Sequence, residues 1–115
     1  MTTISIQYQS GEWEICIEGH AGYRQAKGLP EGTDIVCAAV SILAQTAAQC
    51  FLDLSGDGVQ VKEMELDAEK GKVRISASVC QKREEIKHRV ETMVWTVKNG
   101  LELLTEAYPE YVQFR

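Results

Sequence analysis

The first part of the chain alternates between apolar and polar residues with a period of two. Such alternation is typical of strands that bury one face. Segments 2–8 and 12–18 both follow it, and the turn-forming letters "QSGE" lie between them. The apolar positions are Ile4, Ile6, Tyr8, Trp13, Ile15 and Ile17. The pattern predicts a β-hairpin with one solvated face.

Two later segments have the spacing of helices. Segment 34–51 is apolar almost all round, which predicts a helix buried on more than one side. Thr33 or Asp34 can cap its first N–H groups. Segment 82–107 carries apolar residues at steps of three and four, and Pro109 ends the pattern. Its stripe consists of Ile86, Val90, Met93, Val97, Leu101 and Leu104.

Two more strands are predicted near 59–66 and 72–79. A change of phase between Val61 and Met64 indicates a β-bulge in the first of them. The element order is then β-β-α-β-β-α. We therefore expect a single α+β domain over residues 1–115, with a four-stranded sheet and two helices packed on one face. The strand order stays open.

Segment 19–33 holds four glycines and a proline and has no apolar period. We interpret it as one long loop. Loops of this length in compact domains tend to carry function.

Composition narrows the class of protein. The chain has 115 residues, a net charge of −5 and a pI near 5.0, which argues against direct binding to nucleic acid through phosphate contacts. We find no apolar stretch of the ~18 uncharged residues that a membrane helix needs. The N-terminus lacks the pattern of a signal peptide. A cytoplasmic protein with reduced cysteines is expected.

The cysteines do not predict a metal site. Cys37 and Cys50 lie thirteen residues apart on one predicted helix. That spacing is about 20 Å, whereas zinc ligands lie about 2.3 Å from the metal. No C-x-x-C pair occurs either. We expect neither a metal nor a cofactor.

Cys37 has two interpretations. It can be a small buried apolar residue, as free cysteines often are. It also lies in the first turn of the predicted helix, where free N–H groups and the helix dipole lower a thiol pKa. The same N–H groups could form an oxyanion hole. Cys16, Cys50 and Cys80 have no comparable setting, and we assign them to packing.

Three polar residues could assist Cys37. His20 ends the second predicted strand, and the glycine-rich segment returns from it to the start of the helix, so imidazole and thiol could meet as a Cys–His pair. Asp34 could cap the helix, orient the imidazole or bind substrate. Ser41 follows Cys37 by four residues and shares its helix face. Its hydroxyl could bond near the thiol, but a bond back to the helix is favoured.

At these residues the chain resembles the ribosomal-processing cysteine proteases (Prp). The matching letters are "GHAGY" at 19–23 and "GTDIVCAAVSIL" at 32–43. The resemblance implies a catalytic dyad of His20 and Cys37, with Asp34 and Ser41 in support. The positions that it implies for substrate binding are Gly19, Ala21, Gly22, Tyr23 and Gly32. The segment between the dyad residues looks longer than in other members, which bears on peptide specificity.

The resemblance also implies a substrate. Members remove a short N-terminal extension from bacterial large-subunit ribosomal protein twenty-seven, after a phenylalanine, and they form homodimers. The apolar helix 34–51 and the off-stripe residues Val94, Trp95 and Leu103 agree with a symmetric interface. The alternative is a non-catalytic, dimeric ribosome-associated binding protein. A third class, a thiol redox sensor, needs a resolving cysteine, and spacing alone does not exclude Cys16.

Overall fold

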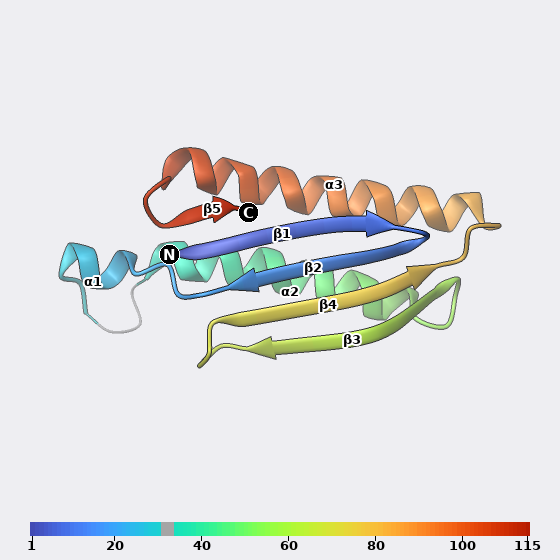
Figure 1. Cartoon of the computed structure of the whole chain (residues 1–115), viewed down its shortest axis with the longest axis horizontal. Helices are drawn as coiled ribbons and strands as arrows, with labels where there is room; N and C mark the ends of the chain where they lie inside the picture. Colours follow the sequence, from blue (N-terminus) through green and yellow to red (C-terminus); the bar gives the residue numbers. More distant parts are fainter. Residues whose placement is uncertain (31–33) are drawn as a thin grey trace.

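The computed structural model describes residues 1–30 and 34–115 and places them in an elongated α+β fold of 51 × 25 × 19 Å. Its elements in chain order are β1 (Thr2–Gln9), β2 (Glu12–Glu18), α1 (Tyr23–Lys27), α2 (Ile35–Leu54), β3 (Val59–Asp67), β4 (Lys72–Val79), α3 (Glu84–Ala107) and β5 (Val112–Phe114). The five strands found in these residues form one sheet in the order β3-β4-β2-β1-β5 (Figure 1).

Both predicted hairpins are confirmed, and β2 joins β4 at the centre of the sheet. Ile15 is opposite Ile6 on one side and opposite Ile75 on the other, so the apolar positions of three strands share one face. The register of β3 against β4 shifts between Val61 and Glu63, which confirms the bulge. The alternation in the sequence therefore set both the strands and their buried face.

The two long helices cover the apolar face of the sheet, as predicted (Figure 1). Phe51 of α2 and Leu101 of α3 are fully buried together with the sheet residue Ile75. The opposite face is solvated and carries ion pairs such as Lys62–Glu12 and Arg74–Glu14. The catalytic candidates lie at one end of this layered structure, where α2 begins.

The strand count was predicted too low. A fifth strand, β5, pairs in parallel with β1 at the register Thr2↔Val112. It is only three residues long and follows Pro109 closely, so it shows no period in the sequence. Val94 also differs from its predicted role, because it is 2% exposed and belongs to the core, whereas Trp95 is 64% exposed.

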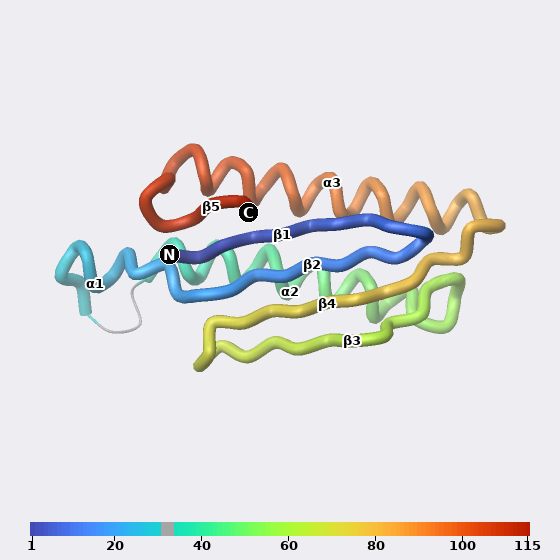
Figure 2. Tube along the Cα trace, viewed as in Figure 1, coloured from blue at the N-terminus to red at the C-terminus, as the bar shows by residue number. Residues whose placement is uncertain are grey.

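The segment 19–33 is not a plain loop, because it contains the five-residue helix α1. Gly22 and Gly28 flank α1, and both adopt the left-handed conformation that glycine tolerates best. The N–H groups of Gly28 and Leu29 bond the carbonyls of Gln25 and Arg24, which is the Schellman pattern of a helix end. In Figure 2 α1 lies beyond the end of the sheet, next to the start of α2.

The expectation that no apolar stretch has membrane length is wrong for α2. Its 20 residues have a mean hydropathy of 1.8 in the most apolar window, which is enough by length and composition to cross a membrane. A core helix passes the same test, and part of α2 is packed inside the fold. Its buried residues are Val36, Val40, Ala44, Ala47, Ala48 and Phe51.

Candidate active site

The start of α2 is fixed by Asp34, which confirms this residue as the helix cap. Its Oδ1 accepts a hydrogen bond of 2.9 Å from the N–H of Cys37. Its Oδ2 accepts one of 3.1 Å from the N–H of Arg24, at the first turn of α1. One carboxylate therefore ties α1 to α2. Thr33, the other predicted cap, lies outside the described residues.

The environment of Asp34 keeps its carboxylate charged. Burial alone would raise the pKa of this carboxyl group, but the N–H groups of Cys37 and Arg24 outweigh burial and hold the pKa below its ordinary value. The negative charge beside the first turn of α2 also agrees with the positive end of the helix dipole.

Cys37 is half-buried, and its sulfur accepts a hydrogen bond from a neighbouring loop. The N–H of Ala21 donates to Sγ over 3.3 Å. Burial raises the pKa of the Cys37 thiol, the Ala21 N–H lowers it, and the charge of Asp34 raises it again, so the net direction is upward. The prediction of a depressed thiol pKa is therefore wrong for this state. The carboxylate that caps the helix opposes the thiolate that the helix start would favour.

Asp34 also occupies the N–H groups that were expected to form an oxyanion hole. The N–H of Cys37 donates to its side chain, and the N–H of Ala38 donates to its carbonyl oxygen over 3.0 Å. Neither donor is free for a substrate oxyanion in this state. The N–H of Ala21 faces the sulfur instead.

His20 follows the end of β2 and is exposed. Its Nε2 lies 2.9 Å from the carbonyl oxygen of Glu69, in the turn between β3 and β4. Next to it, the N–H of Gly19 donates to the carbonyl of Gly71 in the same turn over 2.8 Å. The β3–β4 turn thus contacts both the backbone and the ring of the segment that carries His20.

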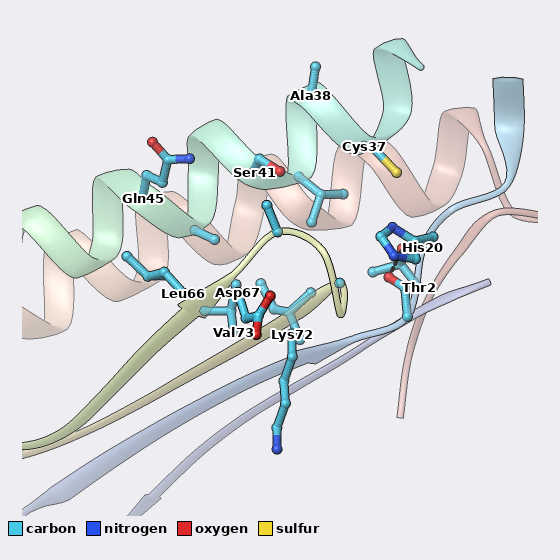
Figure 3. Close-up of a pocket in the computed structure, with 16 residues that line it drawn as sticks. Thr2, His20, Cys37, Ala38, Ser41, Gln45, Leu66, Asp67, Lys72 and Val73 are labelled. Carbon is cyan, nitrogen blue, oxygen red and sulfur yellow. Dashed lines mark hydrogen bonds between the residues drawn. The ribbon is translucent and has the colours of Figure 1, made fainter. Parts of the chain in front are cut away.

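Cys37 and His20 line one cavity of about 290 Å³. Figure 3 shows the sulfur of Cys37 and the ring of His20 at the same end of this cavity, below the first turns of α2. No hydrogen bond joins the thiol to the imidazole within residues 1–30 and 34–115. Such bonds are often long without substrate and tighten in the reacting complex. The structure therefore brings a thiol and an imidazole to one cavity, which is the minimum for nucleophilic thiol chemistry.

The family described as cysteine protease Prp matches residues 1–113 of the chain. This chain belongs to the Prp family of cysteine proteases. No curated protein sequence matches it.

Several solved structures share its fold, two of them of a Prp. A crystal structure of an essential ribosomal processing protease Prp from S. aureus, in complex with a covalently linked product peptide, has a TM-score of 0.71 and 19% identity, and the match covers 100% of this chain and 98% of that one. A second S. aureus Prp structure, with a substrate peptide, has a TM-score of 0.66, 21% identity and the same coverage. SMU.848 from Streptococcus mutans has a TM-score of 0.68 and 23% identity, covering 100% and 92% of the chains.

Of the remaining positions of the Prp-like motif, Ser41 and Gly19 line the same cavity. Within the described part of the chain the hydroxyl of Ser41 makes no hydrogen bond, so the expected bond back to the helix is absent. Ala21 is buried beside Cys37. Gly22 is the left-handed residue that starts α1. Gly32 lies outside the described residues.

Tyr23 has partners that the sequence did not indicate. Its ring packs edge-on against Tyr108, at 5.6 Å between centroids, and against Tyr111, at 5.4 Å. These two residues lie between α3 and β5, far along the chain. The contact docks α1 on the C-terminal segment, and no local pattern could have revealed it. The carbonyl of Glu69 was missed for a similar reason, because a main-chain atom leaves no signature in side-chain spacing.

Cys16 does not face Cys37. It alternates with Ile15 and Ile17 on β2 and so lies on the solvated face of the sheet, where its thiol bonds Glu14 over 3.5 Å. Burial raises the pKa of the Cys16 thiol, and Glu14 raises it further. A resolving role toward Cys37, on the other side of the sheet, is therefore not supported. Residues 1–30 and 34–115 also contain no group of three or more His, Cys, Asp or Glu residues that could hold a metal ion.

Proposed function

We propose that this chain is a cysteine endopeptidase that removes the N-terminal extension of bacterial large-subunit ribosomal protein twenty-seven during ribosome assembly. The observation that carries the proposal is the shared cavity of Cys37 and His20 in a member of the Prp family. Similarity to an S. aureus ribosomal processing protease with a bound substrate peptide supports the substrate class.

The proposed reaction uses His20 as the base. Because burial and Asp34 raise the pKa of Cys37, the resting residue is a thiol, and a base must take its proton as the sulfur attacks. The sulfur bonds the peptide carbonyl carbon, and the imidazolium of His20 then protonates the leaving amine. Water attacks the thioester, the carbon–sulfur bond breaks, and the free acid leaves.

The oxyanion is proposed to form against the loop rather than against the helix. Asp34 occupies the N–H groups of Cys37 and Ala38, whereas the N–H of Ala21 already points at the sulfur. An oxygen on the carbon bonded to that sulfur would lie within reach of the same donor.

The cavity supports an apolar side chain next to the cleaved bond. Beyond the thiol its apolar lining residues are Ile17, Val40, Ala44, Leu66 and Val73, and the polar residues Gln45, Asp67 and Lys72 line it as well. A phenylalanine, the residue after which Prp-like enzymes are expected to cut, suits such a lining. In this proposal Gly19, Ala21, Gly22, Tyr23 and Gly32 border the bound peptide, while Asp34 and Ser41 support the dyad.

The proposal includes a homodimer. Five large apolar side chains are exposed on the two long helices: Ile35 at 54%, Ile42 at 61%, Leu52 at 47%, Trp95 at 64% and Leu103 at 65%. A symmetric interface would remove them from water. Light scattering at micromolar concentration tests this point, and a monomer mass would contradict it.

The deciding experiment is cleavage of the organism's own ribosomal protein twenty-seven by the purified chain. We expect one cut within its N-terminal extension, detected by mass spectrometry. Cys37→Ala should remove the activity, whereas Cys80→Ala, at the other end of the molecule, should retain it. Equal cleavage by Cys37→Ala and the wild type would exclude Cys37 as the nucleophile. A protein that binds the substrate without any cleavage would support the non-catalytic alternative.

A further inference from the structure

The imidazole of His20 has a main-chain partner. Its Nε2 lies 2.9 Å from the carbonyl oxygen of Glu69, within hydrogen-bond range. A carbonyl oxygen can only accept, so Nε2 carries the proton in this bond. A neutral imidazole has a single N–H group, and Nδ1 is then the nitrogen with the free lone pair. The contact therefore selects one of the two tautomers.

The turn that supplies this carbonyl is held on both sides. The N–H of Lys70 donates to Oδ1 of Asp67 over 3.1 Å, and the N–H of Gly71 donates to the carbonyl of Ala68 over 3.3 Å. The carbonyl of Gly71 accepts the N–H of Gly19 over 2.8 Å. The acceptor for the ring and the backbone before His20 are thus parts of one bonded unit.

Gly71 allows the turn to approach the ring. Its φ is +59°, in the left-handed region that other residues rarely adopt. A Cβ at this position would lie 3.1 Å from Cε1 of His20 and 3.1 Å from the carbonyl carbon of Gly19. The ring and the strand end would both have to yield to it. Only glycine keeps this turn and the imidazole at their present separation.

We propose that the β3–β4 turn is the positioning element of the dyad, with the Glu69 carbonyl in the role that a third side chain has in other thiol proteases. This inference rests on the proposed function of His20 and Cys37. The carbonyl holds the ring with Nδ1 as the base for the thiol proton. Once Nδ1 takes that proton, the Nε2–H bond becomes charge-assisted and stronger, which favours the ion pair formed during attack.

In this proposal the side chain of Glu69 has no part in positioning the His20 ring. Other charged residues lie in this region: Asp67 and Lys72 line the same cavity, and the Met1 ammonium donates to the His20 carbonyl over 2.8 Å. Removal of the Glu69 carboxylate leaves the carbonyl in place. Glu69→Ala should therefore keep the wild-type tautomer of His20.

The test compares Gly71→Ala with Gly56→Ala. Gly56 also has a positive φ, of +86°, but a Cβ there meets nothing within 4 Å. Both variants carry the backbone cost of alanine in the left-handed region, and only Gly71→Ala presses on His20. With ¹⁵N-labelled histidine, NMR reports which ring nitrogen bears the proton, and His88→Gln assigns the signals. The spectra can be recorded in a Cys37→Ala background, independent of any cleavage.

We expect wild-type His20 in the Nε2–H form, with Gly56→Ala unchanged and Gly71→Ala shifted toward the other tautomer. In the cleavage assay Gly71→Ala should lower kcat by roughly tenfold to a hundredfold with little change in KM, as for a displaced catalytic group. A proton on Nδ1 in the wild type, or a Gly71→Ala variant that matches Gly56→Ala in both spectrum and kcat, would overturn the proposal. Absence of cleavage in the wild type would count against the proposed function alone, because the spectra would still test the tautomer.

Discussion

The two ends of the sheet carry similar groups in different settings. At one end Cys37 and His20 meet the β3–β4 turn, beside a cavity of about 290 Å³. At the other end Cys80 follows β4 and borders a shallow hollow between β3 and β4, and His88 lies in the first turns of α3. Each end therefore has a cysteine, a histidine, glycine turns and a concave surface. Only the first has the arrangement of an active site.

The difference lies in how the groups are held. Cys37 is half-buried on a helix capped by Asp34, and His20 is bonded to a turn from a separate hairpin. Cys80 is exposed, and the imidazole of His88 is 74% exposed and lies 3.9 Å from the carboxylate of Glu91. Residue types and a hollow are thus insufficient for a site. Chain segments that converge and fix each side chain make the difference.

The histidines should give the largest contrast. We expect His20→Ala to lower kcat/KM for the ribosomal substrate by roughly 10²–10⁴-fold, the usual contribution of a general base. His88→Ala, which removes an exposed imidazole, should leave kcat/KM within about twofold, since surface changes of this kind have small effects. Cleavage rates at several substrate concentrations provide the measurement. Equal losses in both variants would mean that His20 is no base and that the two ends differ only in shape.

The two thiols should differ in their rate of alkylation, and here the exposed end should react faster than the active-site end. Because burial and Asp34 raise the pKa of Cys37 above its ordinary value of 9.0, iodoacetamide should label this residue slowly at pH 7 and faster as the pH rises. Cys80 is exposed and should react first. Asp34→Asn removes a negative charge beside the Cys37 sulfur and should speed its labelling by roughly threefold.

Peptide mass spectrometry of partly labelled protein separates the four cysteines. Cys50→Ser is the control for Asp34→Asn. Cys50 lies on the same helix but away from Asp34, so this variant should leave the labelling rate of Cys37 unchanged. Faster labelling of Cys37 than of Cys80 at pH 7 would contradict a raised pKa for Cys37 and favour the thiolate interpretation of its helix position.

Much of the fold could be predicted because it follows from periodicity. The alternation through Ile15 and Ile75 gave the strands and their buried face, and the apolar steps of α3 gave its length. β5 could not be predicted, since its three residues gain their stability from pairing with β1 rather than from a pattern of their own. α1 was hidden because it has only five residues and none of them is fully buried.

The site was predictable only in part. His20 and Cys37 could be selected because a loop must return from a strand end to a helix start. The direction of the Cys37 thiol pKa depends first on burial and then on the charge of Asp34, and a helix position alone cannot weigh these effects against the helix dipole. The Glu69 carbonyl and the Tyr23 ring contacts arise from tertiary packing between distant segments. Sequence spacing contains no record of them.

The smallest expected contrast is in the free energy of unfolding, and it concerns two aspartates, one at each end of the sheet. Asp34 accepts two backbone N–H groups, and Asp34→Ala should lower the free energy of unfolding by about 1–2 kcal/mol, as loss of a helix cap does. Asp57 pairs with Arg83 at the surface, where its side chain is 61% exposed, and Asp57→Ala should cost less than about 1 kcal/mol.

The effect of Asp34→Ala on stability should also depend on pH. The folded pKa of Asp34 lies below its ordinary value of 3.8, so its carboxylate stabilises the fold fully above that value. The stabilisation is lost as the pH falls through the folded pKa, where both states bind the proton. Urea unfolding of the wild type and Asp34→Ala should therefore show a constant gap from pH 7 to pH 5 and a shrinking gap below 3.8. A gap that stays constant in acid would mean that Asp34 acts through packing, and the electrostatic contrast between the two ends would lose its basis.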